Sequence, residues 1–276
     1  MSNEPIKFSI KQTVSPTAEP IHRTEFKNHQ RVDINDEDGV IDGYIAAARQ
    51  ALEVRYKFQA CAATWRMRMD ELQWYQDESG VQYIPLPRGP LLNVSSVTYV
   101  DTTGVTQTWS STNYTVDTDD NRLVLAYGAN WPSLRNQVGG LTINYRSGYV
   151  APFTATTGDV LTIPATTYAN TETVRLSNSG GTLPAGLSTL ADYYVVGTTG
   201  QTIQLSTSSG GAAVDITDTG SGNNYVGELP YPIRVAISAM AAHLYENREP
   251  VNIGNIVKIP MHVDSMMATA WDGVLY

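Results

Sequence analysis

Apolar residues recur every three or four positions in two long stretches, which is the spacing of one face of an α-helix. The first stretch predicts a helix from Glu37 to about Tyr56, and a shorter helix is expected before it at Thr24–His29. The second predicts a helix that begins at Pro232 and is ended by Pro250. The two long apolar faces consist of Val40, Ile41, Tyr44, Ile45, Ala48 and Leu52, and of Ile233, Ala236, Ile237, Met240 and Leu244.

Between the helices, short runs alternate polar and apolar residues or are rich in β-branched residues, which is typical of strands. Asp101–Gly104 and Asp119–Asn121 have the residue types of tight turns between such runs. Ile84–Pro90 contains three prolines, and this favours an extended connector over a central strand. The predicted strands of this part are Thr64–Met69, Asn93–Val100, Val105–Trp109, Tyr114–Asp117, Arg122–Ala126 and Leu141–Arg146.

The middle of the chain has a different composition. Residues 153–226 are crowded with Thr, Ser and Gly, and they contain one basic residue, Arg175, against five acids. We therefore expect three parts: 1–152 as the first part of a core, 153–226 as an inserted β-domain, and 227–276 as the final helix and tail of the core. The strands predicted in the insert are Asp159–Ile163, Glu172–Ser177, Asp192–Val196, Gln201–Ser206 and Ala213–Thr217.

The balance of charge limits the range of partners. Of 276 residues, 18 are Lys or Arg and 27 are Asp or Glu, so the formal charge is −9. This acidic balance argues against tight binding to DNA phosphates. Arg66 and Arg68 on one strand, and Arg49 and Arg55 on the first helix, leave a phosphate-binding patch open, but a solvated surface or salt bridges between subunits fit an acidic chain better. No apolar run is long enough to span a membrane, and no secretory signal is visible at the N-terminus.

The sequence contains no arrangement of residues that is typical of catalysis. The four histidines, His22, His29, His243 and His262, lack metal-ligand spacing, and there is no nucleophile elbow or Walker motif. Cys61 is flanked by alanines, which indicates packing and not a nucleophile with a lowered pKa. We therefore expect no catalytic residues, no cofactor and no metal site.

The C-terminal segment is unusually apolar. It ends in Trp271, Val274, Leu275 and Tyr276, and exposed apolar side chains tend to be buried against another surface. The residues predicted to contact a partner are Met266, Trp271, Val274 and Tyr276.

The order of these features resembles the head–tail connector proteins of tailed bacteriophages, also called adaptor or head-completion proteins. The resemblance covers about 1–150 and 228–276, while 153–226 has no counterpart in the simple members of that family. Ile84–Tyr99, with its prolines followed by a strand, is the most specific stretch. The other stretches are Pro16–Asp33, Asp36–Tyr56, Leu141–Tyr149 and Leu229–Glu249.

This resemblance implies an α+β fold, with an α-helical connector core, a small antiparallel β-sheet and the inserted all-β domain. It also implies a structural virion protein at the neck, made in the cytoplasm of the bacterial host. Such proteins form a homo-oligomeric ring, typically a dodecamer, below the portal protein, extend the DNA channel, and offer a platform to a tail, stopper or tail-terminator protein. DNA would pass through without sequence-specific binding, because an acidic wall repels its phosphates. The inserted domain would face outward, toward fibre, whisker or capsid proteins.

Two other functions remain open at this stage. A tail-fibre or receptor- or glycan-binding protein would use the β-domain as its recognition module, although fibres tend toward repetitive β-sequence. A hydrolytic enzyme would need a catalytic constellation, and none is visible in the sequence.

Overall fold

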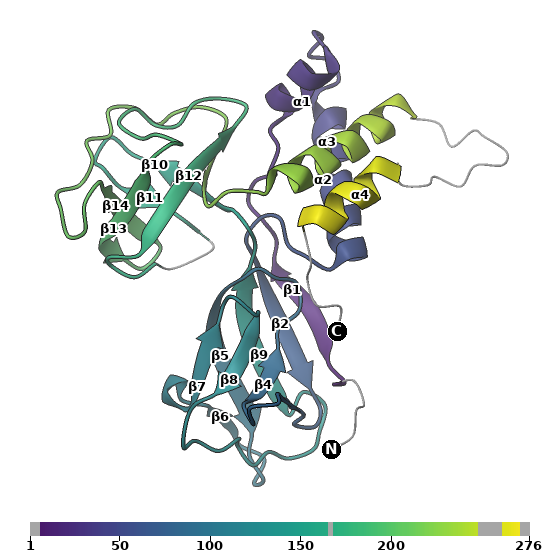
Figure 1. Ribbon diagram of the computed structural model, residues 1–276, viewed down its shortest axis with the longest axis vertical. Helices are drawn as coiled ribbons and strands as arrows, with labels where there is room; N and C mark the ends of the chain where they lie inside the picture. Colours follow the sequence, from purple (N-terminus) through teal and green to yellow (C-terminus); the bar gives the residue numbers. More distant parts are fainter. Residues whose placement is uncertain (1–5, 165–167, 248–260, 271–276) are drawn as a thin grey trace, which may run out of the picture. The chain divides into compact units, whose positions relative to one another are not determined.

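The structure is a computed structural model that describes residues 6–164, 168–247 and 261–270 (Figure 1). The chain forms two compact units. Unit 1 consists of Met1–Ser15, Ala62–Gly148 and Val274–Tyr276, and unit 2 of Pro16–Cys61 and Tyr149–Gly273. Within the described residues, every α-helix belongs to unit 2.

Unit 1 contains two antiparallel sheets. The first has five strands in the order β1-β2-β9-β5-β6, and the second has four strands in the order β3-β4-β8-β7. The strands of the first sheet are β1 (Ser9–Val14), β2 (Ala63–Met69), β9 (Leu141–Ser147), β5 (Leu91–Val100) and β6 (Thr106–Thr108). Those of the second are β3 (Tyr75–Gln76), β4 (Gln82–Pro85), β8 (Arg122–Leu125) and β7 (Tyr114–Asp117), which follows a short 3₁₀ turn, η1 (Ser111–Asn113).

Buried and more exposed residues alternate along β2 and β9, and this alternation explains how unit 1 packs. Successive side chains of a strand point to opposite faces, so one face of each strand is apolar and buried while the other is polar. The apolar faces build a core with residues of the four-stranded sheet. Its buried members are Ala63, Trp65, Met67, Met69, Ile84, Leu86, Leu91, Val97, Trp109, Leu123, Leu141, Ile143 and Tyr145.

The prediction that Ile84–Pro90 is an extended connector was wrong for the first two residues of this segment. Ile84 and Pro85 lie in β4, which stands between β3 and β8. Only Tyr83 and Gln82 pair with β3, whereas Pro85 pairs with Arg122 of β8 alone. Pro85 is therefore tolerated, because its missing N–H group falls where the strand has a neighbour on one side only.

Four helices form the first part of unit 2: α1 (Arg23–Gln30), α2 (Asp38–Tyr56), α3 (Tyr231–Glu246) and α4 (Met261–Ala270). The helices predicted at 24–29, 37–56 and from Pro232 are thus confirmed, while α4 was not predicted. Their apolar faces meet in a core that includes Phe26, Ile41, Ile45, Leu52, Ile233, Ile237, Val263 and Met267. Among the described helices, none combines the length and the apolar character that a membrane span requires.

The second part of unit 2 is a closed barrel of six antiparallel strands, in the order β10-β11-β14-β13-β12-β15. The strands are β10 (Ala151–Ala155), β11 (Leu161–Thr162), β14 (Thr202–Ser206), β13 (Asp192–Thr199), β12 (Thr173–Ser179) and β15 (Asn223–Val226). Four of the five strands predicted between 153 and 226 are present with shifted ends. The fifth, Ala213–Thr217, is not a strand, and β15 closes the barrel instead by pairing with both β10 and β12.

The expected fold class, an α+β protein with an α-helical connector core and a small sheet, was wrong. The described residues form 15 strands in three antiparallel sheets and only four α-helices, so the protein is mostly β. The error has a physical cause: a strand such as β3, with two residues, is too short to have a readable period of its own, and it exists because the neighbouring strand β4 pairs with it.

Candidate functional site

The predicted partner-contact residues are only partly described by the structure. Met266 is half-buried in α4 and packs on the helical core, next to the buried Val263 and Met267. Trp271, Val274 and Tyr276 lie outside the described residues. The prediction that these four residues contact a partner therefore remains a prediction.

The chemistry of Cys61 matches a packing role. The thiol is fully buried, and this burial raises its pKa well above the ordinary value. A buried, protonated thiol is a poor nucleophile.

Each described histidine side chain has a local structural contact. His22 Nδ1 accepts a hydrogen bond of 3.2 Å from the N–H of Thr24 and so caps α1. His29 contacts Gln30, and His243 contacts Asn247. His262 belongs to α4, and its side chain is not described. Within residues 6–164, 168–247 and 261–270, no three His, Cys, Asp or Glu side chains gather as metal ligands would.

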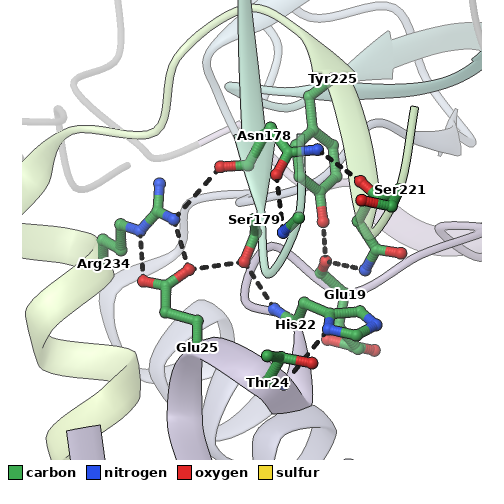
Figure 2. A network of polar contacts seen from close by, with 11 residues as sticks. Glu19, His22, Thr24, Glu25, Asn178, Ser179, Ser221, Tyr225 and Arg234 are labelled. Carbon is green, nitrogen blue, oxygen red and sulfur yellow. Dashed lines mark hydrogen bonds and ion pairs between the residues drawn. The ribbon is translucent and has the colours of Figure 1, made fainter. Parts of the chain in front are cut away.

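A network of polar contacts lies in unit 2, where the helices meet the barrel; we call it the helix–barrel junction (Figure 2). Its centre is Glu25 of α1. Arg234 of α3 donates to both carboxylate oxygens of Glu25, with an Nε–Oε1 distance of 2.7 Å. The hydroxyl of Ser179, at the end of β12, donates to Oε2 of Glu25 at 2.6 Å. The same hydroxyl accepts the N–H of His22 at 2.7 Å, so one strand end is bound to both α1 and the residue that caps it.

A second set of bonds surrounds the carbonyl oxygen of Glu19. This oxygen accepts the hydroxyl of Tyr225 and, at 3.2 Å, the side-chain amide of Asn223. Tyr225 is buried and packs in the helical core although it belongs to the barrel strand β15. Asn178 of β12 donates to the carbonyl of Ser221 at 2.8 Å, which holds the neighbouring loop of the barrel in place.

Gly180 is needed at this junction for two reasons. Its φ angle is +76°, a conformation that residues with a Cβ adopt at a cost, and a Cβ there would overlap the ring of His22. The turn after β12 thus approaches the start of α1 more closely than any residue with a side chain would allow.

The ion pairs at the junction are mutually stabilising. Burial alone would raise the pKa of Glu25, but the hydrogen bonds from Arg234 and Ser179 outweigh it and hold this pKa below its ordinary value. The pKa of Arg234 is raised by its bond to Glu25. Both groups are therefore charged at neutral pH and bound to each other.

A second ion network lies along α2 and shares Glu19 with the junction. The buried Arg49 binds Glu19 and Glu53, with 2.6 Å between nitrogen and oxygen in each pair. Glu53 also accepts the N–H of Ala60 and the side-chain amide of Gln59, both at 2.9 Å. Burial raises the pKa of Glu53 in spite of Arg49, whereas the two carboxylates raise the pKa of Arg49 in spite of its burial.

These networks fix structure and leave no reactive group available. Glu25, Ser179 and Arg234 satisfy one another, and the carboxylate of Glu53 is saturated by protein donors. An adjoining cleft of about 330 Å³ is lined in part by Arg23 and Asp42, but these two form an ion pair at 3.1 Å. Sequence reasoning missed the junction. Its residues are up to 209 positions apart, and no local pattern connects Glu25 with Arg234.

Comparison with known proteins gives a match of fold. No protein-family model matches the sequence, and no curated protein matches it. Among solved structures, the chain is similar to one from the virion of a native gene transfer agent (GTA) particle, with 16% identity, a TM-score of 0.52, and coverage of 95% of this chain and 94% of that chain. It is also similar to a chain from the neck of an empty GTA particle computed with C6 symmetry, with 15% identity, a TM-score of 0.51 and 94% coverage of both chains.

This similarity extends over both units, including the barrel of unit 2. Because nearly the whole of each chain is aligned, the similarity concerns the fold of the whole chain and not a single common module. At 15–16% identity the shared property is the fold, and residue roles do not transfer with it.

Proposed function

We propose that this chain is a structural protein of the neck of a phage-like particle. The observation that carries the proposal is the shared architecture over 95% of the chain with a component of a GTA virion, together with the similar chain from a GTA neck. The sequence features that resemble head–tail connectors support the same location from separate evidence.

In this proposal the chain is an adaptor that assembles as a ring of twelve copies between the portal and the tail or its stopper. The ring would extend the DNA channel without reading the sequence of the DNA, and its formal charge of −9 per copy would keep the duplex from adhering. The barrel would face outward and contact neighbouring fibre or capsid proteins. The C6 symmetry reported for one similar neck is compatible with a ring whose copy number is a multiple of six.

A deletion and imaging experiment tests the proposal. Removing the gene for this chain should give DNA-filled heads that lack tails, and supplying the chain in trans should restore joined particles. In cryo-electron micrographs of wild-type particles, density that fits both units should lie between head and tail. Particles that keep their tails after the deletion, or that contain the chain only in distal fibres, would contradict the adaptor role and favour the recognition-module alternative.

A further inference from the structure

Four basic side chains share the outer face of the five-stranded sheet in unit 1; we call this surface the basic sheet face. In register, Lys11 of β1 lies directly opposite Arg66 of β2, and Arg146 of β9 lies opposite Thr64. Arg68 is two residues beyond Arg66, so it points to the same side of the sheet. The four cations therefore occupy three neighbouring strands.

The opposite face of these strands is the apolar core of unit 1, which fixes the direction of the cations. Trp65, Met67 and Ile143 alternate with them and are buried. A one-residue slip of register would bury the arginines, so the packing of the core holds them outward. Their cross-strand neighbours on the outer face are neutral and polar: Ser9, Asn144, Thr142, Thr64, Asn93, Ser96 and Thr98.

None of the four cations makes an ion pair within the described residues. Asp70 and Glu71 lie beside Arg68 at the end of β2 without pairing with it. Four other arginines of the chain, Arg49, Arg122, Arg175 and Arg234, each bind a carboxylate.

Two of the arginines are partly buried and gain little hydrogen bonding in return. Arg66 Nε is buried and has no hydrogen-bond partner among the described residues. Arg146 has one weak bond, 3.3 Å to the hydroxyl of Thr64, and burial lowers its pKa. Neither guanidinium group has a carboxylate within the described residues to offset its partial burial, so a carboxylate of another molecule placed over this face would stabilise both.

The charge of the chain is distributed unevenly between the units. Unit 1 has eight Lys or Arg against nine Asp or Glu, a formal charge of −1, although half of its cations lie on this one face. Unit 2 has ten against 18, a formal charge of −8. Every copy of the chain thus carries both a basic surface and a strongly acidic unit.

We propose that the basic sheet face of unit 1 binds the acidic unit 2 of a second copy of this chain. This inference rests on the proposed ring, because a contact between two different surfaces of identical subunits is the type that closes a ring. Duplex DNA is the weaker alternative. Its phosphates would meet four cations on a chain whose formal charge is −9, whereas nucleic-acid-binding domains are typically basic overall.

The test compares two variants of the full chain that each lose two positive charges. R66Q/R68Q changes the basic sheet face, and R135Q/K57Q changes exposed cations elsewhere, so both have a net charge of −11. In sedimentation velocity at low salt, the wild type and the control should self-associate equally, and R66Q/R68Q should weaken association by about tenfold or more. Wild-type association should also fall as salt rises. Equal melting curves for the two variants exclude misfolding as the cause.

Cross-linking identifies the second surface. A zero-length carbodiimide reagent joins the amine of Lys11 to a nearby carboxylate, and a mixture of isotopically light and heavy copies distinguishes links between chains from links within one. We expect intermolecular links from Lys11 to acidic residues of 16–61 or 149–273.

Several results would overturn the inference. These are a wild type that stays monomeric, association that R66Q/R68Q leaves unchanged, and links confined to unit 1. If a labelled duplex binds the wild type and R66Q/R68Q abolishes that binding while association persists, the face is a DNA surface instead. None of these outcomes decides whether the chain occupies the neck, because that is read from particles and not from purified protein.

Discussion

Replacing Glu25 with Gln tests whether the helix–barrel junction stabilises unit 2. Gln keeps the size of the side chain and can still accept a bond from Ser179, but it lacks the charge that binds Arg234. The change therefore replaces a bidentate ion pair by one neutral acceptor, the amide oxygen of Gln, beside the 3.4 Å contact of the guanidinium to the carbonyl of Asn178.

The structure sets the size of the expected effect. The side chains of Arg234 and Glu25 are 25% and 30% exposed, so the pair is intermediate between a surface pair and a fully buried one. Surface pairs contribute about 0–1 kcal/mol, while breaking a buried pair costs about 3–5 kcal/mol. E25Q should therefore lower the free energy of unfolding of unit 2 by about 2 kcal/mol.

The two units can be followed separately in denaturant. All four described α-helices lie in unit 2, so far-ultraviolet circular dichroism follows that unit. Trp65, Trp74, Trp109 and Trp131 lie in unit 1, so tryptophan fluorescence follows unit 1 in a W271F background. E25Q should shift the helical transition and leave the fluorescence transition in place.

The pH dependence of the stability of unit 2 gives a second measurement of the Glu25–Arg234 ion pair. The folded-state pKa of Glu25 is lowered, so its stabilisation is present above the unfolded value of 4.5 and is lost as pH falls through the lower folded value. The difference in stability between wild type and E25Q should hence be constant near neutrality and shrink in acid. A difference that is already absent at neutral pH would refute the role assigned to this pair.

Three further predictions follow from single residues. G180A should destabilise unit 2 by at least about 1 kcal/mol more than G210A, with the unfolding of unit 2 followed by circular dichroism. Both sites have positive φ, but only a Cβ at Gly180 would overlap His22. Cys61 should resist a thiol reagent in the native protein and react on unfolding, and rapid native labelling would contradict its raised pKa and burial. The ring of Trp131 stacks between those of Trp74 and Trp109. W131A removes this middle ring and should lower the free energy of unfolding of unit 1 by about 2–3 kcal/mol, measured by tryptophan fluorescence. An unshifted midpoint would show that the stacked rings are not stabilising.

The sequence was most informative where a periodic pattern was long. The 19 residues of α2 bury Ile41, Ile45, Ala48 and Leu52, four of the six residues on the face that the spacing predicted. Of the other two, Tyr44 is half-buried and Val40 is exposed. In α4 the pattern is shorter, and buried Val263 and Met267 alone do not distinguish a helix from a loop. Its position depends on contacts with the other helices, which are not readable from the segment itself.

The strands that were missed have a common cause. β1 and β15 lie at residues 9–14 and 223–226, far in sequence from the strands β2 and β10 with which they pair. Pairing over such distances is decided by the whole fold and not by local propensity. The same holds for the junction and for the basic sheet face. Arg66 and Arg68 were recognised together on one strand, but their alignment with Lys11 and Arg146 appears only once the registers are known.

The barrel and the helices are more closely joined than a simple insertion would require. Tyr225, at the end of β15, is buried in the helical core and donates to the carbonyl of Glu19. Removing 153–226 would delete Tyr225 and Ser179 together, exposing apolar surface on the helices and leaving Glu25 without one of its donors. The expectation that 153–226 is a separable domain therefore remains a prediction. A deletion that tests it should keep Tyr225. If unit 2 still fails to fold with that residue kept, the barrel is part of the same cooperative unit as the helices, and any force on the barrel would be transmitted directly to α1 and α3.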